Sequence, residues 1–184
     1  MKNFKLVVLL PLLGFFFFNS CYEQSFITLE SSSDGILYPV EIDIPLTVSA
    51  SDGGSKNTCK GSLTIDDDLF CALKGYLVDM RNFDVRWVTI QVFAEGNTGG
   101  AINNLTLTAG KDHLLIQSYW VGTTYDGHDS QLIDLVQSVF DQVLPPVSAT
   151  LTMEVSGETN VDADTPLNCK LTVDYAITIP APRY

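Results

Sequence analysis

The chain has 184 residues, which leaves room for one domain or a small pair of domains. It carries 10 Lys+Arg against 22 Asp+Glu, a net charge of −12, and 46% of its residues are hydrophobic. The hydrophobic content excludes a disordered acidic chain. The acidic balance argues against a nucleic-acid partner, because phosphates require clustered lysine and arginine.

The first twenty residues have the pattern of a secretory signal peptide. Lys2 and Lys5 form a positive start, and the 13 residues from Leu6 to Phe18 carry no charge. This run is shorter than the roughly 20 apolar residues of a membrane-spanning helix, and it fits the hydrophobic region of a signal peptide. Its removal would leave 8 Lys+Arg against 22 Asp+Glu, a net charge of −14.

The sequence FNSC ends this segment and resembles the processing site of a bacterial lipoprotein precursor. The resemblance implies a signal peptide over 1–20 and a diacylglyceryl, palmitate-type modification of Cys21. Two or more acyl chains anchor a protein stably, whereas one binds only marginally. Tyr22, which follows the cysteine, favours the outer membrane by the same resemblance, with the periplasmic or cell-surface face left open. An ordinary signal peptide, with Cys21 an incidental thiol, is the alternative.

Residues 21–38 are expected to be the lipidated cysteine and a polar tether, rich in serine. Residues 39–184 are expected to form the folded domain. Alternating apolar and polar residues predict strands over 40–50, 85–94, 147–157 and 169–179, and weaker ones over 59–65, 102–109 and 113–121. One dry and one wet face per strand is typical of antiparallel sheets. We therefore predict a mainly β fold, an antiparallel β-sandwich, immunoglobulin-like or related.

Two segments have helical rather than alternating periodicity. Residues 130–144 place six apolar side chains on one stripe, with Asp129 or Ser130 as the N-cap and Pro145-Pro146 as the stop. Residues 68–80 give a weaker pattern, for which Asp66–Asp68 are available as cap and dipole partners. We expect one or two short helices at the ends of the sandwich.

The order of these segments resembles the small all-β lipoproteins of Bacteroidota-type envelopes. The resemblance rests on the lipid-type cysteine, the strand sequences VTIQVFAEG, INNLTLTAG, LTMEVSGE and LTVDYAITI, and the helices between them. It implies a fold and an outer-membrane location, and it names no activity, because that family is largely uncharacterised.

With Cys21 acylated, three cysteines are left in an oxidising compartment. A disulfide between Cys59 and Cys71 is disfavoured, because a strand over 59–65 would carry the chain about 20 Å away from Cys59. Cys59 and Cys169 both lie in the apolar phase of strands, so they are the candidate disulfide. The alternative is that all three are small buried hydrophobic residues.

The loop from Tyr119 to Asp129 is the candidate binding site. Aromatic side chains beside hydrogen-bonding acids suit a sugar, which presents apolar C–H faces and hydroxyl edges. The alternatives are a cation held by the acids and the imidazole, or an ordinary turn in which Trp120 is core and Tyr119 a rim residue. The candidate binding residues are Tyr119, Trp120, Tyr125, Asp126, His128 and Asp129.

No catalytic motif, metal-ligand cluster or cofactor loop is present in the sequence. We therefore expect a non-catalytic cell-envelope lipoprotein with no cofactor and no metal, held on the membrane by acylated Cys21, that binds or helps assemble an envelope protein. A glycan-binding accessory module that uses the 119–129 loop is the alternative.

Overall fold

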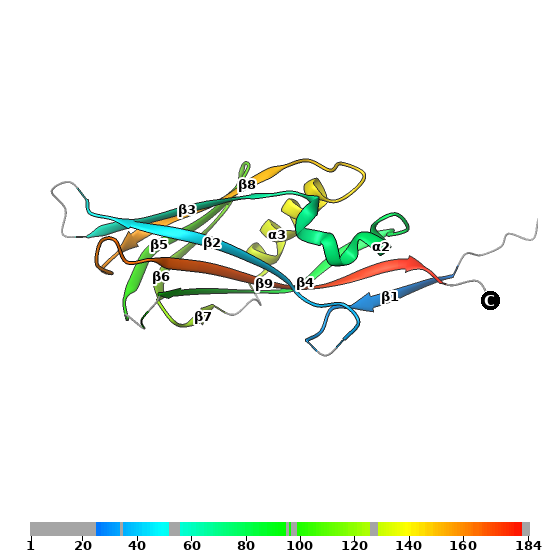
Figure 1. Cartoon of the computed structure of the whole chain (residues 1–184), viewed down its shortest axis with the longest axis horizontal. Helices are drawn as coiled ribbons and strands as arrows, with labels where there is room; N and C mark the ends of the chain where they lie inside the picture. Colours follow the sequence, from blue (N-terminus) through cyan, green and yellow to red (C-terminus); the bar gives the residue numbers. More distant parts are fainter. Residues whose placement is uncertain are drawn as a thin grey trace, which may run out of the picture.

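The computed structural model describes residues 25–33, 35–51, 56–94, 96, 99–125 and 129–181 (Figure 1). These residues confirm a mainly β, antiparallel fold with short helices. Cys21 and the expected signal peptide lie outside the described residues.

Nine strands form one strongly curved sheet, in the order β6-β5-β8-β3-β2-β9-β4-β7, with β1 paired to β9. Every long strand predicted from alternation is present, with small shifts of its bounds. The strands are β1 (Phe26–Glu30), β2 (Val40–Ser49), β3 (Asn57–Ile65), β4 (Asn82–Ala94), β5 (Ala101–Ala109), β6 (Asp112–Trp120), β7 (Thr124–Tyr125), β8 (Leu151–Thr159) and β9 (Leu167–Pro180).

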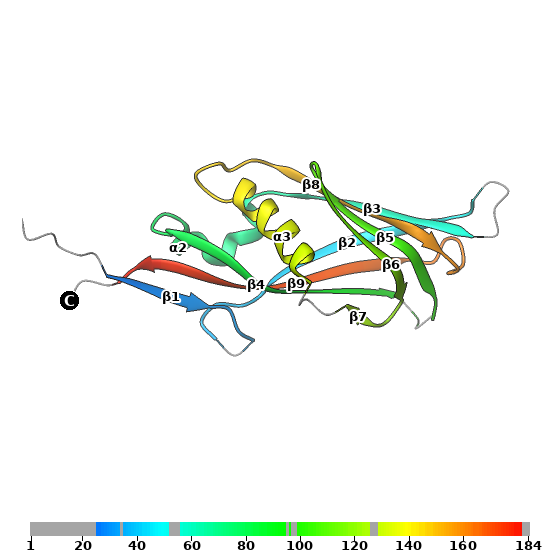
Figure 2. The same cartoon turned by 180° about the vertical axis from the view of Figure 1, so that it is seen from behind.

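The sheet curls until its two edges approach each other, which makes it nearly a closed barrel. After β6, the chain turns at once into β7, which pairs with β4 at Ile90 and Gln91. The helix α3 (Ser130–Val143) lies across the opening and contacts β4, β6 and β8 (Figure 2). Six apolar side chains of α3 are buried there, as its periodicity predicted: Leu132, Leu135, Val136, Val139, Phe140 and Val143.

The expected helix over 68–80 is broken into two short pieces. A 3₁₀ helix, η1 (Asp67–Leu73), begins at Asp66, whose side chain accepts a hydrogen bond from the Asp68 N–H at 3.1 Å. Its backbone is non-helical at Phe70, and only a four-residue α-helix follows, α2 (Lys74–Leu77). The prediction of one continuous helix over 68–80 is therefore wrong, although the N-cap, Asp66, is among the residues expected to supply it. Burial explains the break, because Phe70 is 1% exposed and lies in the aromatic core.

Four aromatic rings form the core beneath η1 and α3. Phe70 and Phe83 both pack edge-to-face on Phe140, with ring centroids 4.9 and 5.3 Å apart, and Phe83 stacks on Tyr175 at 4.7 Å. Such ring pairs stabilise a core beyond their simple burial. This cluster joins η1, β4, α3 and β9 into one body.

Residues expected to form a free tether are instead part of the sheet. β1 (Phe26–Glu30) pairs antiparallel with the C-terminal part of β9, from Phe26 opposite Pro180 to Glu30 opposite Ala176. The tether prediction is thus corrected from residue 26 onward. This segment forms a strand because β9 is longer than β2. The edge of β9 that β2 leaves free beyond Val173 is paired by β1.

One close approach between strands depends on glycine. A Cβ atom on Gly61 of β3 would lie 2.2 Å from the Pro45 carbonyl oxygen of β2 and 2.7 Å from a Leu46 methyl group. The two strands can therefore cross at this point only because Gly61 has no side chain.

The molecule is elongated, with its described chain ends together. The Ala181 N–H donates to the Ser25 carbonyl oxygen at 2.9 Å, which joins the first and last described segments. We call the opposite end, where β6 finishes at Trp120 and β4 at Ala94, the distal end (Figure 1). None of the helices in the described part of the chain combines the length and hydrophobicity needed to cross a membrane.

Candidate functional site

Tyr119 is a structural residue of the β6–β7 corner rather than part of an exposed platform. It is 3% exposed, and its hydroxyl accepts a hydrogen bond from the Val92 N–H at 2.8 Å and donates one to the Thr123 carbonyl. Burial raises the pKa of Tyr119 above its ordinary value. The phenol therefore joins β6 to β4 where the sheet nearly closes.

Trp120 is the exposed aromatic of the corner, with 63% of its surface in solvent. The expectation of a core tryptophan beside a rim tyrosine is thus reversed by the structure. Its carbonyl accepts two hydrogen bonds from Thr123, from the hydroxyl at 2.6 Å and the N–H at 3.1 Å. Gly122, with φ +87°, lets the chain make this tight turn.

Tyr125 and Asp129 are committed to each other and to the start of α3. The Tyr125 hydroxyl donates to the Asp129 carboxylate at 2.7 Å, and this hydrogen bond raises the pKa of Tyr125. The second oxygen of Asp129 accepts from the Gln131 N–H at 2.9 Å, so Asp129 is the N-cap. Asp126 and His128 lie outside the described residues. Of the loop positions that the structure describes, only Trp120 offers a free aromatic face.

No group of three or more His, Cys, Asp or Glu side chains is placed to hold a metal ion among the described residues. A polar hollow of about 440 Å³ lies between the β5–β6 turn and α3, and Asp112, His113 and Asp134 are among its lining residues. Its Asp112 carboxylate accepts a hydrogen bond from the Ser138 hydroxyl at 2.9 Å. That contact ties the turn to α3.

The structure has Cys59 and Cys169 as free thiols, without the expected disulfide. Both are fully buried, as their strand phase predicted. Strand β2 lies between them, with Val48 opposite Cys59 and Ile44 opposite Cys169. Burial raises the pKa of Cys169 to about 12, whereas Cys71 is exposed on η1. Two strand spacings of about 4.8 Å each separate their Cα atoms by more than the about 7 Å that a disulfide spans, so the expected disulfide is corrected to two buried thiols.

A second surface, which sequence reasoning missed, lies on the loop between β1 and β2. Leu37 is 4% exposed and points into the protein, while its neighbours Ile36 and Tyr38 are 80% and 65% exposed. Two large apolar side chains are thus held in solvent on either side of a buried one. Isolated exposed apolar residues are common, so the meaning of this pair depends on what lies beside it.

Hydrogen bonds fix this loop to β9. The Ser31 N–H donates to the Tyr175 carbonyl at 2.8 Å, and the Ser31 hydroxyl accepts from the Tyr175 N–H at 2.8 Å. The Ser32 N–H donates to the Leu37 carbonyl at 2.9 Å. The buried Tyr175 hydroxyl donates to the Tyr38 carbonyl at 3.0 Å, and burial raises the pKa of Tyr175 to about 12. The backbone that carries Tyr38 is therefore preorganised.

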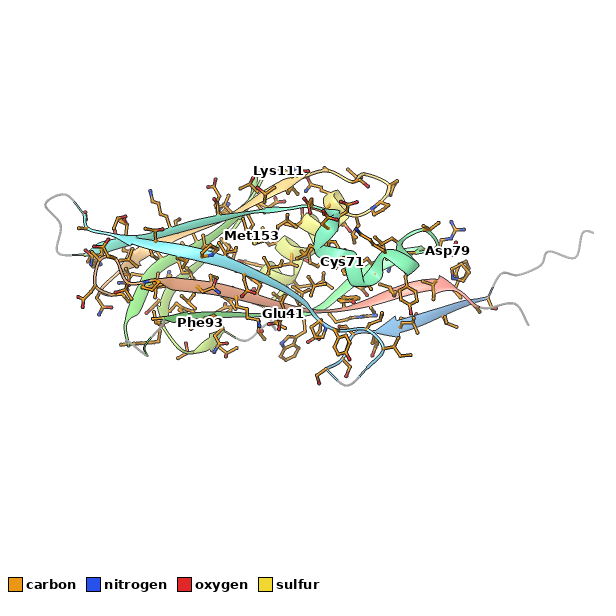
Figure 3. The ribbon with its side chains drawn as sticks, in the orientation of Figure 1. Glu41, Cys71, Asp79, Phe93, Lys111 and Met153 are labelled. Atoms are coloured by element: carbon orange, nitrogen blue, oxygen red, sulfur yellow. The ribbon has the colours of Figure 1, made fainter. Side chains whose placement is uncertain are left out.

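An apolar groove of about 580 Å³ lies beside this loop, and Tyr38 is part of its wall. Phe70 and Leu73 of η1 and Tyr175 of β9 contribute its deepest side chains, all at most 2% exposed. Glu41 lies on its rim, at the start of β2 near the middle of the molecule (Figure 3), and forms an ion pair with Lys170 at 2.8 Å. We call Ile36, Tyr38 and this groove the loop surface.

The loop surface had only a weak signal in the sequence. The order Ile36-Leu37-Tyr38-Pro39 follows a serine-rich run that suggests a tether, and the groove is lined by residues of β2, η1 and β9, which are far apart in the sequence. The hydrophobic triplet before a proline was the one feature that could have marked it.

Comparison with known proteins gives no family for the chain. No protein-family model matches it, and no curated protein matches it. Among solved structures, a chain titled "Desmodium yellow mottle tymovirus" is similar over 79% of this chain and 85% of its own length, with a TM-score of 0.32 and 9% identity. A likeness of that strength is too weak to support any statement about function.

Proposed function

We propose that the protein is a non-catalytic lipoprotein of the outer membrane that binds an envelope protein through the loop surface. Two features support this proposal. The sequence FNSC follows a signal-like segment, and Cys21 precedes the first described residue, Ser25, by four positions. The loop surface supplies a preorganised apolar contact on the folded domain.

The observation that carries the protein-binding part is the exposed Tyr38 on the wall of the groove, with the exposed Ile36 two residues before it in the chain. Burial of such a side chain against a partner contributes about 1.5–3 kcal/mol. Ordering of the Tyr38 backbone costs little, because its carbonyl already accepts a hydrogen bond from the Tyr175 hydroxyl. An exposed aromatic side chain beside an apolar groove suits a protein segment better than a small polar ligand.

The glycan alternative has weaker support from the geometry. A sugar platform needs several free aromatic faces and free hydrogen-bonding acids. At the 119–129 corner Tyr119 is buried, and the Tyr125 hydroxyl and the Asp129 carboxylate bind each other. Trp120 alone is left for stacking among the residues described there.

Site-specific photocrosslinking tests the proposed surface. A photoreactive phenylalanine analogue replaces Tyr38 in the full-length protein, in the cells that make it, and the matched control carries the analogue at Leu115. Leu115 is 52% exposed on β6, away from the loop surface. We expect a light-dependent protein adduct from position 38 and none from position 115. Equal adducts from both positions, or none from position 38, would refute the proposed surface.

Fatty-acid labelling tests the anchor separately. Cells grown with an alkyne-tagged fatty acid are expected to label the wild-type protein and to place it in the outer-membrane fraction. The Cys21→Ser variant is expected to lose both the label and the membrane association. A Cys21→Ser variant that keeps its acyl label would contradict anchoring at this residue.

A further inference from the structure

Three apolar side chains are exposed at the end of the molecule where the described chain begins. Phe26 and Ile27, the first residues of β1, are 49% and 37% exposed, and Val78, in the turn between α2 and β4, is 89% exposed. Val78 therefore contributes almost no hydrophobic burial to the stability of the fold. We call these three residues the tip.

The tip is a rigid part of the sheet. Ile27 pairs with Ile179 and Phe26 with Pro180 across the β1–β9 ladder. The segment after Val78 is held to the same strand, because the Arg81 N–H donates to the Thr178 carbonyl at 2.8 Å. Asp79, the neighbour of Val78, lies near the end of β9 in Figure 3, far from Phe93 at the distal end.

The few residues between Cys21 and Phe26 limit how far the tip can lie from an anchor at Cys21. Only residues 22–24 separate Cys21 from Ser25, so the two Cα atoms lie within about 14 Å of each other at full extension. The polar headgroup region on each side of a bilayer is several ångströms thick. An acylated Cys21 would therefore hold Phe26 at or near the headgroups.

The charges at the tip favour a shallow position. Asp79 and Arg81, one and three residues beyond Val78, are both exposed. An aspartate is costly in hydrocarbon, whereas an arginine can keep its charge at the phosphate level while its stem lies along apolar surface. The side chains thus match the boundary between headgroups and acyl chains, where apolar side chains of surface-bound proteins lie.

We propose that the tip contacts the phospholipid bilayer, with Phe26, Ile27 and Val78 at the boundary between headgroups and acyl chains. This inference rests on the proposed anchoring at Cys21. The lipid-anchored domain then stands with its distal end, which carries Trp120, away from the membrane. The membrane is the occupant because the chain enters the sheet at Phe26 of the tip, five positions after the proposed anchor Cys21.

Fluorescence quenching by lipids tests the contact. The full-length lipidated protein is prepared with Cys71→Ser, which removes the exposed thiol, and with Val78→Cys, which accepts an environment-sensitive fluorophore. Both positions are exposed, so neither change disturbs packing. The matched control carries Trp120→Cys instead. The proteins are reconstituted in phosphatidylethanolamine–phosphatidylglycerol vesicles with or without spin-labelled lipid.

We expect the fluorophore at position 78 to shift to shorter wavelength and to lose intensity with the spin-labelled lipid, and the fluorophore at position 120 to do neither. Protein that floats with the vesicles but shows the same emission at both positions overturns the membrane contact while leaving the anchor intact. Protein that does not float with vesicles overturns both. A shift at position 78 that depends on protein concentration and not on the quencher overturns the inference in favour of contact between two copies.

Discussion

The hydrogen bonds of Tyr119 make a quantitative prediction for the Tyr119→Phe variant. Phenylalanine keeps the ring and its packing, so no cavity opens, but the hydroxyl is lost. The Val92 N–H, at a residue with 0% exposure, then has no acceptor within the protein. A buried donor left without a partner costs about 1–3 kcal/mol, so we expect a loss of about 2 kcal/mol in the free energy of unfolding.

The change is measured by urea unfolding of the purified mature protein, followed by circular dichroism, and by thermal unfolding. For a chain of this size, a loss of about 2 kcal/mol lowers Tm by about 4–8 °C. Tyr125→Phe is the matched control. Its hydroxyl meets the Asp129 carboxylate, which water can solvate after the change, so we expect a loss below about 1 kcal/mol. Equal losses in the two variants, or a Tyr119→Phe variant as stable as wild type, would refute the assigned role of Tyr119.

Three further predictions concern the strands around β2. Gly61→Ala is expected to destabilise the fold by about 1–3 kcal/mol in urea unfolding, because the new methyl group collides with the Pro45 carbonyl, and an unchanged midpoint would contradict the close approach. Among the cysteines that the structure describes, Cys71 alone is expected to react with a maleimide in the native protein. Unfolding without reductant is expected to expose Cys59 and Cys169 as two more thiols, and no further labelling would contradict their free state. Under reducing conditions, the contribution of Cys169 to the free energy of unfolding is expected to be fully present below pH 9 and to fall as the pH rises toward 12, because burial opposes ionisation of its thiol. Between pH 9 and 11, the free energy of unfolding of the Cys169→Ala variant is expected to fall by about 2–3 kcal/mol less than that of the wild type. Parallel pH profiles of the two proteins would contradict this role of Cys169.

The sequence was a good guide wherever one periodicity ran through a whole element. Strand β2 alternates without a break from Val40 to Ser49, and α3 has an apolar stripe between an aspartate cap and a proline pair. Both elements bury one face, so local pattern and tertiary packing favour the same structure. Their bounds could therefore be predicted within one or two residues.

The predictions that are wrong concern residues whose structure depends on contacts with distant parts of the chain. Phe26–Glu30 is a short run next to serines, and it is a strand only because β9 offers a free edge there. The backbone breaks at Phe70 because its ring enters the aromatic core. The alternation in β6 could not show which of Tyr119 and Trp120 is buried. The groove of the loop surface is lined by residues of β2, η1 and β9, so the local signal at Ile36–Pro39 could not reveal it.

The pairing of β1 with β9 has a mechanical consequence. Both strands run along the length of the molecule, and their hydrogen bonds lie across it (Figure 1). A force between a lipid anchor before β1 and a partner farther out would slide β1 along β9. All five residue pairs, from Phe26 opposite Pro180 to Glu30 opposite Ala176, would then carry the force together rather than open one at a time. The same five residues that complete the sheet would thus resist unravelling of the domain under tension.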